Sequence, residues 1–426
     1  MATAGWANER SRLALTQTLP AESPAQAAQR TQGASVFNQP WLIAPSLAQP
    51  EFDGLGPLYN ALSCGACHLL NGRGDMPDSG PPLRSAIVRL STRDKQGAVV
   101  DEPHYGVQLQ TEGIPGVPAE AQLSVRWVEQ SSAWLDGQTI RLRAPKLQVR
   151  ALGYGPLAEG TMLSLRMAPS ITAAGLLEAV PESALLAIAQ EQLAQGQGVH
   201  GQANRVWDIA TRSVALGRFG WKANQPSVRQ QTQVALHEDM GITSSLLASP
   251  NCMPEQRACL DAPDGGHPEI TDDLLDALVA YQQSLVPPSQ QAPTRETSEG
   301  SALFERIGCA SCHRPNLPVD APVASKLGAS EIHPYTDLLL HDMGDGLADG
   351  RPDGLASGRQ WRTAPLWGLG LAPLIRPGAL YLHDGRARSV TEAILWHGGE
   401  ASNAVRRYRE LDASQRRAVL AFLSSL

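Results

Sequence analysis

The sequence predicts a mainly α-helical protein of two domains, with a β-rich insertion in the first. Apolar residues recur at helical spacing in both halves, whereas short segments of alternating character cluster between about residues 98 and 167. A proline-rich run at residues 286–293 has the composition of a linker. We therefore expect one domain at residues 1–290, with the insertion at about 98–167, and a second at residues 291–426.

Composition limits the class of protein. The 426 residues are 42% hydrophobic, which is enough to bury two or three domain-sized cores. The formal net charge of -7 comes without a basic stripe, so nucleic acid is not an expected partner. No apolar run reaches the roughly 18 residues of a membrane-spanning helix, and residues 1–20 lack the pattern of a signal peptide.

The first half begins with a polar segment that we expect to lie on the surface as an arm up to about Gln32. A short helix is predicted at residues 58–63, followed by a loop at 71–82 rich in glycine and proline. Further along, we expect strands at residues 105–110, 122–129, 139–143 and 146–152, and helices at 171–194, 226–240 and 271–284.

The second half is expected to be helical at its beginning and at its end. Helices are predicted at residues 298–307, 391–397 and 412–426, the last with Asp412 as its N-cap. Residues 317–359, between them, are expected to be mostly irregular.

The pattern Cys-x-x-Cys-His occurs twice, with Cys64, Cys67 and His68 in the first copy. Cys309, Cys312 and His313 form the second copy, 245 residues further on (309 minus 64). Two thiols at this spacing can reach the two vinyl groups along one edge of a porphyrin, and the adjacent imidazole can then bind its iron. The sequence thus predicts two covalently bound c-type haems, with His68 and His313 as iron ligands.

Paired cysteines have two other common uses in proteins. A structural zinc ion would need four ligands, which here would have to join distant halves of the chain. A thioredoxin-like dithiol should open a helix after a strand, and neither copy is expected to follow one.

Cys252 and Cys259 lie outside these motifs and are expected either to form a disulfide or to be two buried thiols. A disulfide would require an oxidising compartment, and c-type haem is also attached outside the bacterial cytoplasm. We expect an exported, periplasmic protein whose leader peptide is absent from this sequence.

The chain resembles the bacterial di-haem cytochrome c peroxidase and MauG superfamily, and within it the di-haem oxidoreductases labelled thiol oxidoreductases or putative peroxidases. The resemblance extends over nearly the whole chain after about Gly33. The motifs that carry it in the C-terminal third are Cys309–His313, Leu340–Gly344, Arg362–Trp367 and Tyr381–Arg386. Further stretches similar to that group are Tyr105–Gln110, Ile114–Pro118, Gly217–Lys222 and Glu238–Thr243.

This resemblance implies one haem with both axial positions filled and another with an open face where peroxide reacts. The second ligand of the C-terminal haem is expected at His397, 14 residues after His383 (397 minus 383). Relatives usually have Met there, or Tyr in MauG, so this sequence departs from both. A second imidazole would favour ferric iron and a low potential. The alternative is that His397 only caps its helix.

For the N-terminal haem, the resemblance implies a distal glutamate, and Glu120 is the best match in this sequence. The alternatives are that Glu120 is a solvated turn residue, or that His104 closes the iron as a sixth ligand. His341 and His383 are expected either beside a haem or in structural positions. Relatives also hold a calcium ion between domains, but no EF-hand-like run is present, so calcium is only an additional expectation.

Tryptophan accounts for 9 of the aromatic residues, and relatives use one as a stepping stone for electrons between the haems. The alternative is that these indoles only fill the core around two porphyrins. The candidates in this sequence are Trp127, Trp134, Trp207, Trp221, Trp361, Trp367 and Trp396.

Taken together, these features predict a peroxidase-like di-haem oxidoreductase. Hydrogen peroxide or another small oxidant would react at the N-terminal haem, and a redox partner protein would donate electrons through the C-terminal haem. Two other functions stay open at this point: a non-catalytic di-haem electron-transfer cytochrome, and an accessory protein of iron or haem acquisition.

Overall fold

The computed structural model describes residues 10–21, 23–78, 80, 82–135 and 138–426. Helix makes up 34% of the chain and strand 18%, and the strands form several small sheets. The prediction of a mainly α fold is therefore wrong. Its error lies in the β-structure, which includes longer strands than expected and also hairpins outside the predicted insertion.

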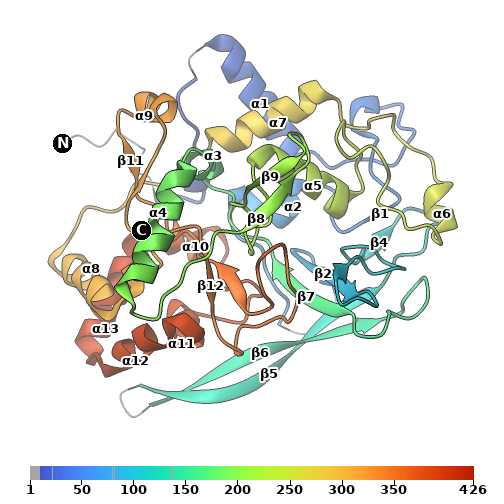
Figure 1. Cartoon of the computed structure of the whole chain (residues 1–426). Coiled ribbons are helices and arrows are strands. Elements are labelled where there is room, and N and C mark those ends of the chain that lie inside the picture. The colour runs from blue at the N-terminus through green and yellow to red at the C-terminus, as the bar shows by residue number, and fades with distance from the viewer. Residues whose placement is uncertain (1–9, 22, 79, 81, 136–137) are drawn as a thin grey trace.

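Most helices lie in the upper and lower left parts of the molecule in Figure 1, and the short α6 lies at its right edge. The helices are α1 (Pro24–Asn38), α2 (Cys64–Cys67), α3 (Ala174–Glu178), α4 (Glu182–Gln195), α5 (Val228–Met240), α6 (Arg257–Leu260), α7 (Asp272–Ser284), α8 (Arg295–Ile307), α9 (Ala321–Leu327), α10 (Ala372–Ile375), α11 (Val390–Trp396), α12 (Ser402–Glu410) and α13 (Ala413–Ser425).

The strands pair mostly as short antiparallel ribbons. They are β1 (Leu58–Tyr59), β2 (Ala86–Arg93), β3 (Val99–Val100), β4 (Glu112–Gly113), β5 (Gln122–Leu135), β6 (Gln138–Arg150), β7 (Met162–Met167), β8 (Arg205–Asp208), β9 (Ser213–Leu216), β10 (Leu317–Pro318), β11 (Glu331–Ile332), β12 (Leu340–Asp342) and β13 (Gln360–Arg362).

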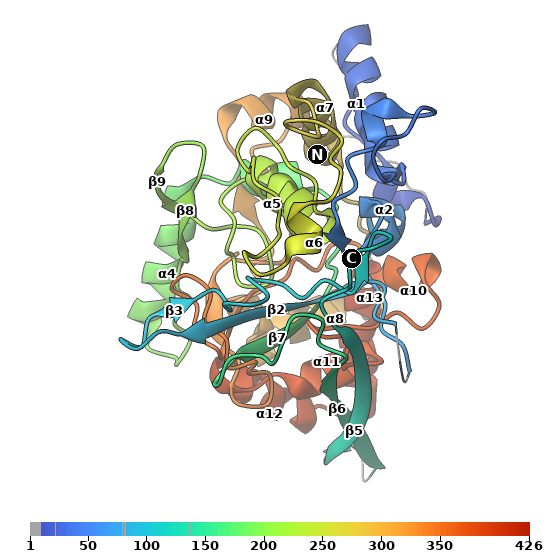
Figure 2. The same ribbon diagram turned by 90° about the vertical axis from the view of Figure 1, so that its right-hand side faces the viewer.

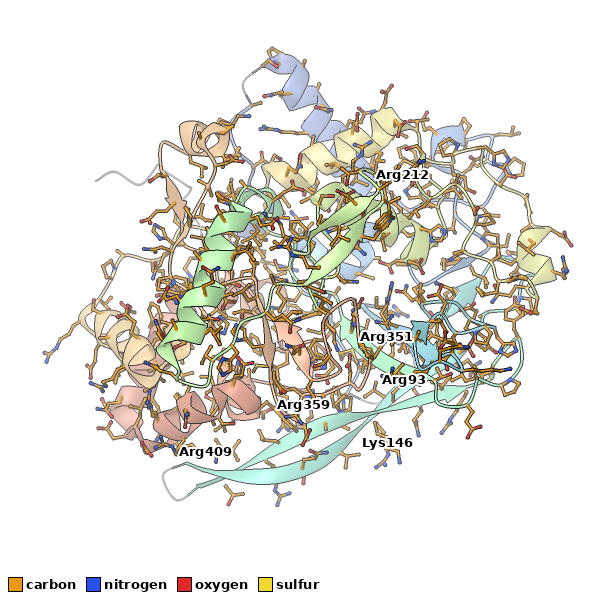
Figure 3. The ribbon with its side chains drawn as sticks, viewed as in Figure 1. Arg93, Lys146, Arg212, Arg351, Arg359 and Arg409 are labelled. Carbon is orange, nitrogen blue, oxygen red and sulfur yellow. A yellow bond between two sulfur atoms is a disulfide. The ribbon has the colours of Figure 1, made fainter. Side chains whose placement is uncertain are left out.

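The β-rich region contains a three-stranded sheet with the order β3-β2-β7 and the long β5–β6 hairpin. The hairpin extends along the lower edge of the molecule and is seen from its side in Figure 2. Arg126 and Lys146 are opposite each other on its two strands, and both side chains are exposed. In Figure 3, Lys146 on the hairpin and Arg409 on α12 both point outward from the lower face.

Helix α1 replaces the polar arm that was expected up to about Gln32. Ser23 caps its N-terminus by accepting a hydrogen bond from the Gln26 backbone N–H, and proline occupies the first turn. The helix packs closely on α7 because Gly33 has no side chain: a Cβ there would lie 1.9 Å from the Ala277 carbonyl oxygen. Its polar composition hid this helix, since few apolar residues mark a buried face.

Several predicted elements differ at their boundaries. The helix expected at residues 171–194 is divided into α3 and α4, with Pro181 as the N-cap of α4. Residues 58–63 are not helical, because Leu58 and Tyr59 pair with β4. The strands expected at 139–143 and 146–152 are the single strand β6, while α12 and the β8–β9 hairpin were not expected.

Two large hydrophobic clusters dominate the described core, and both draw on residues far apart in the sequence. One joins α3, α5 and α7 to the segment around Leu338 and Leu339, and the other joins Leu142 and Trp221 to the C-terminal helices. The domain boundary at residues 290 and 291 stays a prediction. Among the described residues, no helix is long and apolar enough to cross a membrane.

Candidate functional site

The first Cys-x-x-Cys-His motif forms α2 and the turn after it. Ser63 begins the helix by accepting a hydrogen bond from the Ala66 N–H. His68 is directed inward, and its Nδ1 lies 2.8 Å from the Pro169 carbonyl oxygen. A carbonyl can only accept, so Nδ1 carries the proton and Nε2 is left as the free ligand atom. Burial lowers the pKa of His68, which keeps the ring neutral as metal binding requires.

The second motif has the same design on different elements. Helix α8 ends at Gly308, whose left-handed conformation (φ 98°) turns the chain into the motif. His313 Nδ1 lies 2.9 Å from the Tyr335 carbonyl oxygen, again leaving Nε2 free. Phe304 and Tyr335 pack edge to face beside this histidine. Burial, with a smaller contribution from His397, lowers the pKa of His313 to about 4.

His397 follows the last turn of α11 as its C-cap. Its Nδ1 donates to the Ala393 carbonyl oxygen over 2.7 Å, so its Nε2 is also free. Both His397 and His313 line one cavity of about 610 Å³, together with Cys309 and Cys312. The structure thus brings together all four residues predicted for the C-terminal haem.

A second cavity, of about 260 Å³, is lined by Cys64, Cys67 and His68. We call it the N-terminal cavity, and we call the cavity around His313 and His397 the C-terminal cavity. Burial raises the pKa of both thiols to about 12, with a further contribution from the charge of Asp239. The thiols are therefore neutral and would not act as a thiolate redox pair. Like Cys309 and Cys312, they are not joined by a disulfide.

Four arginine side chains that line the N-terminal cavity have buried N–H groups without a hydrogen-bond acceptor. Buried nitrogen atoms without a hydrogen-bond partner are found on Arg73, Arg89, Arg166 and Arg376, all of which line this cavity. Unpaired buried donors are costly unless a ligand accepts from them. Two thiols, a neutral imidazole and surplus arginine donors fit a haem, which has two vinyl groups, an iron and two carboxylates.

Glu120 does not line either of these cavities. Its carboxylate accepts from the Gln110 backbone N–H at 2.7 Å and from Gln256 Nε2 at 2.5 Å. Burial raises its pKa to about 8, with hydrogen bonds to Gln110 and Gln256 acting in the opposite direction. Gln256 lies between Cys252 and Cys259 in the sequence, and these two cysteines form a disulfide, which is the first of the two alternatives that the sequence left open. The distal role of Glu120 stays a prediction.

Asp239, near the end of α5, is the carboxylate that lines the N-terminal cavity. Gln108 Nε2 donates to its Oδ1 over 2.8 Å. Burial raises the pKa of Asp239 to about 6, while the hydrogen bond from Gln108 and the charge of Arg89 lower it. Asp239 lies within Glu238–Thr243, a stretch similar to the family, but the sequence alone predicts no role for it, because its position in the cavity depends on tertiary packing.

The remaining histidine candidates have other surroundings. His104 lies 3.6 Å from Glu102 and lines neither cavity. His341 lies between two carboxylates, Asp337 at 2.9 Å and Glu400 at 2.7 Å. Burial alone would lower the pKa of His341, but the charge of Asp337 and the hydrogen bonds to its partners outweigh burial and raise the pKa well above the ordinary value. His341 and His383 both line the C-terminal cavity. Among the described residues, one group of His, Cys, Asp and Glu has metal-ligand spacing: Cys312, Asp337 and His341.

Trp221 lies between the two candidate haem sites, since it lines both cavities. Its indole Nε1 donates to the Met167 carbonyl oxygen at 2.7 Å, which fixes the ring. Arg73 and Arg362 also line both cavities, and Arg362 Nε donates to the Gly220 carbonyl oxygen. Of the other tryptophan candidates, the side chain of Trp134 lies outside the part that the structure describes.

The family model described as "Di-haem oxidoreductase, putative peroxidase" matches residues 2–426. The chain belongs to this family. Membership implies haem cofactors and an oxidoreductase activity, as the two cavities suggest. No curated protein matches the chain.

Among solved structures, hydrazine synthase from Kuenenia stuttgartiensis is similar at 13% sequence identity and a TM-score of 0.34. That match covers 96% of this chain and 95% of the other.

Proposed function

We propose that this di-haem oxidoreductase reduces hydrogen peroxide at its N-terminal site and receives electrons at its C-terminal site. The observation that carries the proposal is the difference between the two cavities. The C-terminal cavity is lined by His313 and His397, both with a free Nε2. The N-terminal cavity has His68 without a second histidine among its described lining residues, and it has the carboxylate of Asp239.

In this proposal Cys64 and Cys67 would hold one haem through thioether bonds, and His68 would bind its iron. A haem held there would supply the iron chemistry that reduces one peroxide molecule to two water molecules, with two electrons and two protons. Cys309 and Cys312 would attach the second haem, and His313 and His397 would hold its iron. Two histidine ligands would suit electron transfer.

Asp239 is proposed to move the proton that cleavage of peroxide requires. Its pKa of about 6 means that a large fraction is charged at neutral pH, yet it can still accept and return a proton. Gln108 holds Oδ1, so the carboxylate has a fixed orientation toward the cavity. Glu120, the residue implied by the family resemblance, is the competing candidate for this step.

A pair of isosteric variants distinguishes these two carboxylates. Asp239→Asn should lower kcat/KM for peroxide by about 10²–10⁴, whereas Glu120→Gln should leave it within about threefold if Glu120 only ties the Gln256 loop. The reverse result would assign proton transfer to Glu120. Circular dichroism and the haem absorbance of each variant serve as folding controls.

Trp221 is proposed to carry electrons between the sites because, among the tryptophans that the structure describes, it is the one that lines both cavities. A redox partner protein would supply these electrons at the C-terminal site. The location would be periplasmic, because c-type haem is attached outside the bacterial cytoplasm and a disulfide requires an oxidising compartment. Binding of calcium between the domains stays a prediction from the family resemblance.

One observation favours a different function. Met167 and Met240 also line the N-terminal cavity, and a methionine sulfur could serve as a second ligand of the iron that His68 would hold. The protein would then be a non-catalytic electron-transfer cytochrome. Electron paramagnetic resonance of the oxidised protein separates the two: one high-spin and one low-spin haem supports the peroxidase, whereas two low-spin haems that do not react with peroxide, even when half-reduced, would refute it.

A further inference from the structure

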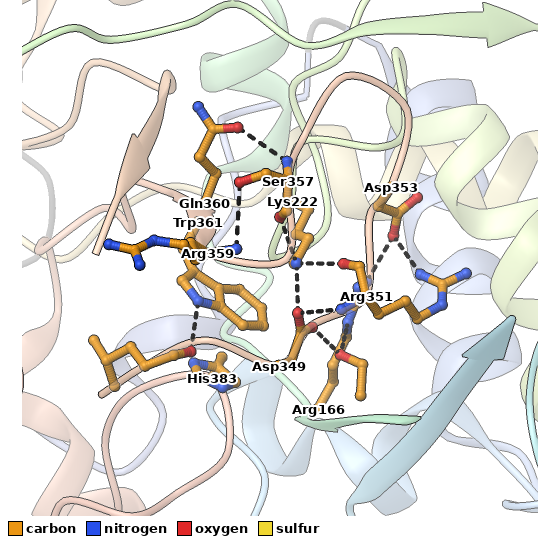
Figure 4. Close-up of polar contacts among 12 residues, drawn as sticks. Arg166, Lys222, Asp349, Arg351, Asp353, Ser357, Arg359, Gln360, Trp361 and His383 are labelled. Carbon is orange, nitrogen blue, oxygen red and sulfur yellow. Dashed lines mark hydrogen bonds and ion pairs between the residues drawn. The ribbon is translucent and has the colours of Figure 1, made fainter. Parts of the chain in front are cut away.

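A buried lysine next to Trp221 lies over the ring of a different tryptophan. Lys222 is fully buried, and its ammonium group donates to Asp349 Oδ1 at 2.7 Å, to the Arg351 carbonyl oxygen at 2.6 Å and to the Ser357 carbonyl oxygen at 2.9 Å. These three bonds use all three donors of the ammonium. Figure 4 shows the lysine nitrogen at the centre of this network, beside the indole of Trp361.

Trp361 has a cation on one side and an imidazole stacked on its ring. Lys222 Nζ lies 4.5 Å from the ring centroid, and Arg166 lies above the same ring at 5.9 Å. The ring of His383 is stacked on Trp361 with centroids 3.6 Å apart and an angle of 14° between the planes. Both rings line the C-terminal cavity, and His383 also contacts Trp221 edge to face at 6.4 Å.

The stacked rings provide a second route for electron transfer, which ends at Trp361. Oxidising equivalents that reach Trp221 could pass through His383 to Trp361 instead of crossing to the C-terminal site. Trp361 would then be oxidised and damaged, and this oxidation would not contribute to electron transfer between the two sites.

The distribution of cations over the indoles distinguishes the two tryptophans. Trp361 lies under Lys222 and Arg166, and Trp396, next to His397, lies under Arg386 at 4.5 Å. In the part of the chain that the structure describes, no cation is found over Trp221. A fixed positive charge over an indole opposes the positive charge that forms when the indole loses an electron, and it does so strongly where water is excluded.

We propose that Lys222 is an electrostatic guard, which keeps oxidising equivalents on Trp221 and away from Trp361. Asp349 holds the ammonium in place, and its charge opposes the effect of burial, which lowers the pKa of Lys222 to about 8. The lysine is therefore charged at neutral pH. This inference rests on the proposed reaction with peroxide, and it adds a residue that protects the protein from that reaction.

Failure of the guard has a defined chemical product. Trp361 would be converted to hydroxytryptophan: one C–H bond of the ring becomes C–OH, and the indole supplies two electrons. One hydrogen peroxide molecule is reduced to one water as its O–O bond breaks. The mass of the peptide that carries Trp361 rises by one oxygen atom.

The test compares the wild-type holoprotein with Lys222→Met after treatment with hydrogen peroxide, followed by digestion and mass spectrometry. We expect the hydroxylated fraction of Trp361 to be at least fivefold larger in the variant, with little change at Trp41, which is buried away from both cavities. The double variant Lys222→Met/Asp349→Asn removes the cation without leaving an unpaired carboxylate, and it should show the same increase if the single variant does not fold. Trp361→Phe added to either variant should abolish the signal.

A purely structural lysine would give a different result. If folded variants retain their haem absorbance and Trp361 is hydroxylated to the same extent as in the wild type, the guard is refuted. A light-driven ruthenium complex with persulfate provides an oxidant that does not depend on peroxide reduction. Suppose that Trp361 is less oxidised in the wild type than in the variant under that oxidant, and that the holoprotein consumes no peroxide in a separate assay. That pair of results would refute the proposed function and leave the guard intact.

Discussion

Replacing Asp239 by asparagine should make the protein more stable at neutral pH and less active. Burial is the main reason that the folded-state pKa of Asp239 is about 6, against an ordinary value of 3.8. At 1.36 kcal/mol per pH unit, this gap corresponds to roughly 3 kcal/mol of unfolding free energy. Asparagine has nearly the same shape and still offers Gln108 a carbonyl oxygen, so the substitution removes mainly the charge.

The sign follows from which state holds the proton more tightly. Because the folded protein binds a proton at Asp239 more tightly than the unfolded chain does, the carboxylate destabilises the fold fully above about pH 6. That destabilisation disappears as the pH falls from about 6 to 3.8. Asp239→Asn should therefore be more stable than the wild type by up to about 3 kcal/mol at pH 8 and nearly equal to it at pH 4.

Urea unfolding at pH 4, 6 and 8 measures this difference directly. Asp101→Asn, at an exposed position, is the matched control and should change the unfolding free energy by less than about 0.5 kcal/mol. The rising limb near pH 6 in the pH profile of kcat/KM should also vanish in Asp239→Asn. Equal stability of the variant and the wild type at every pH would refute the raised pKa and, with it, the proposed role of Asp239 in proton transfer.

Three other predictions follow from the same geometry. His397→Met should shift one haem potential strongly in the positive direction, as measured by spectroelectrochemistry, and unchanged potentials would rule out His397 as a ligand. Trp221→Phe should slow electron exchange between the haems at least tenfold in flash photolysis, while Trp367→Phe, at a residue that lines only the N-terminal cavity, should not. Gly33→Ala should destabilise the fold by about 1–3 kcal/mol in urea unfolding, because its Cβ would lie 1.9 Å from the Ala277 carbonyl oxygen.

Sequence periodicity predicted the helices whose apolar face or N-cap can be recognised from their own residues. Thr271 and Asp412 both cap their helices as expected, with α7 and α13 beginning at the next residue. Helix α1 and the hairpin β8–β9 were not predicted. Helix α1 has a polar sequence, and the hairpin has exposed Trp207 and Val214 opposite each other. Burial depends on the partner that packs on a segment, and one sequence does not show that partner.

The candidate site divides in the same way. The Cys-x-x-Cys-His motifs are local patterns, so His68 and His313 could be named from the sequence. His397 required a fixed distance from another motif, and the structure places it on the cavity wall with His313. The end of α5 lies beside the segment before α2, where the Asn60 and Ala61 N–H groups donate to the Asp239 carbonyl oxygen. Trp221 belongs to the hydrophobic cluster that contains Phe304 of α8. These positions depend on tertiary packing, and no spacing rule connects Asp239 or Trp221 to His68.

The segment Gly217–Lys222 positions two neighbouring residues, Trp221 and Lys222, that have different proposed roles. Trp221 is held by the Met167 carbonyl oxygen, and the next residue, Lys222, is held by Asp349 on a distant loop. Because Trp221 and Lys222 are fixed to different partners, the position of the Trp221 indole relative to the Lys222 ammonium group is also fixed. A mutation that shifts this segment would move both at once, so changes in electron transfer and in oxidative damage at Trp361 should occur together in such variants.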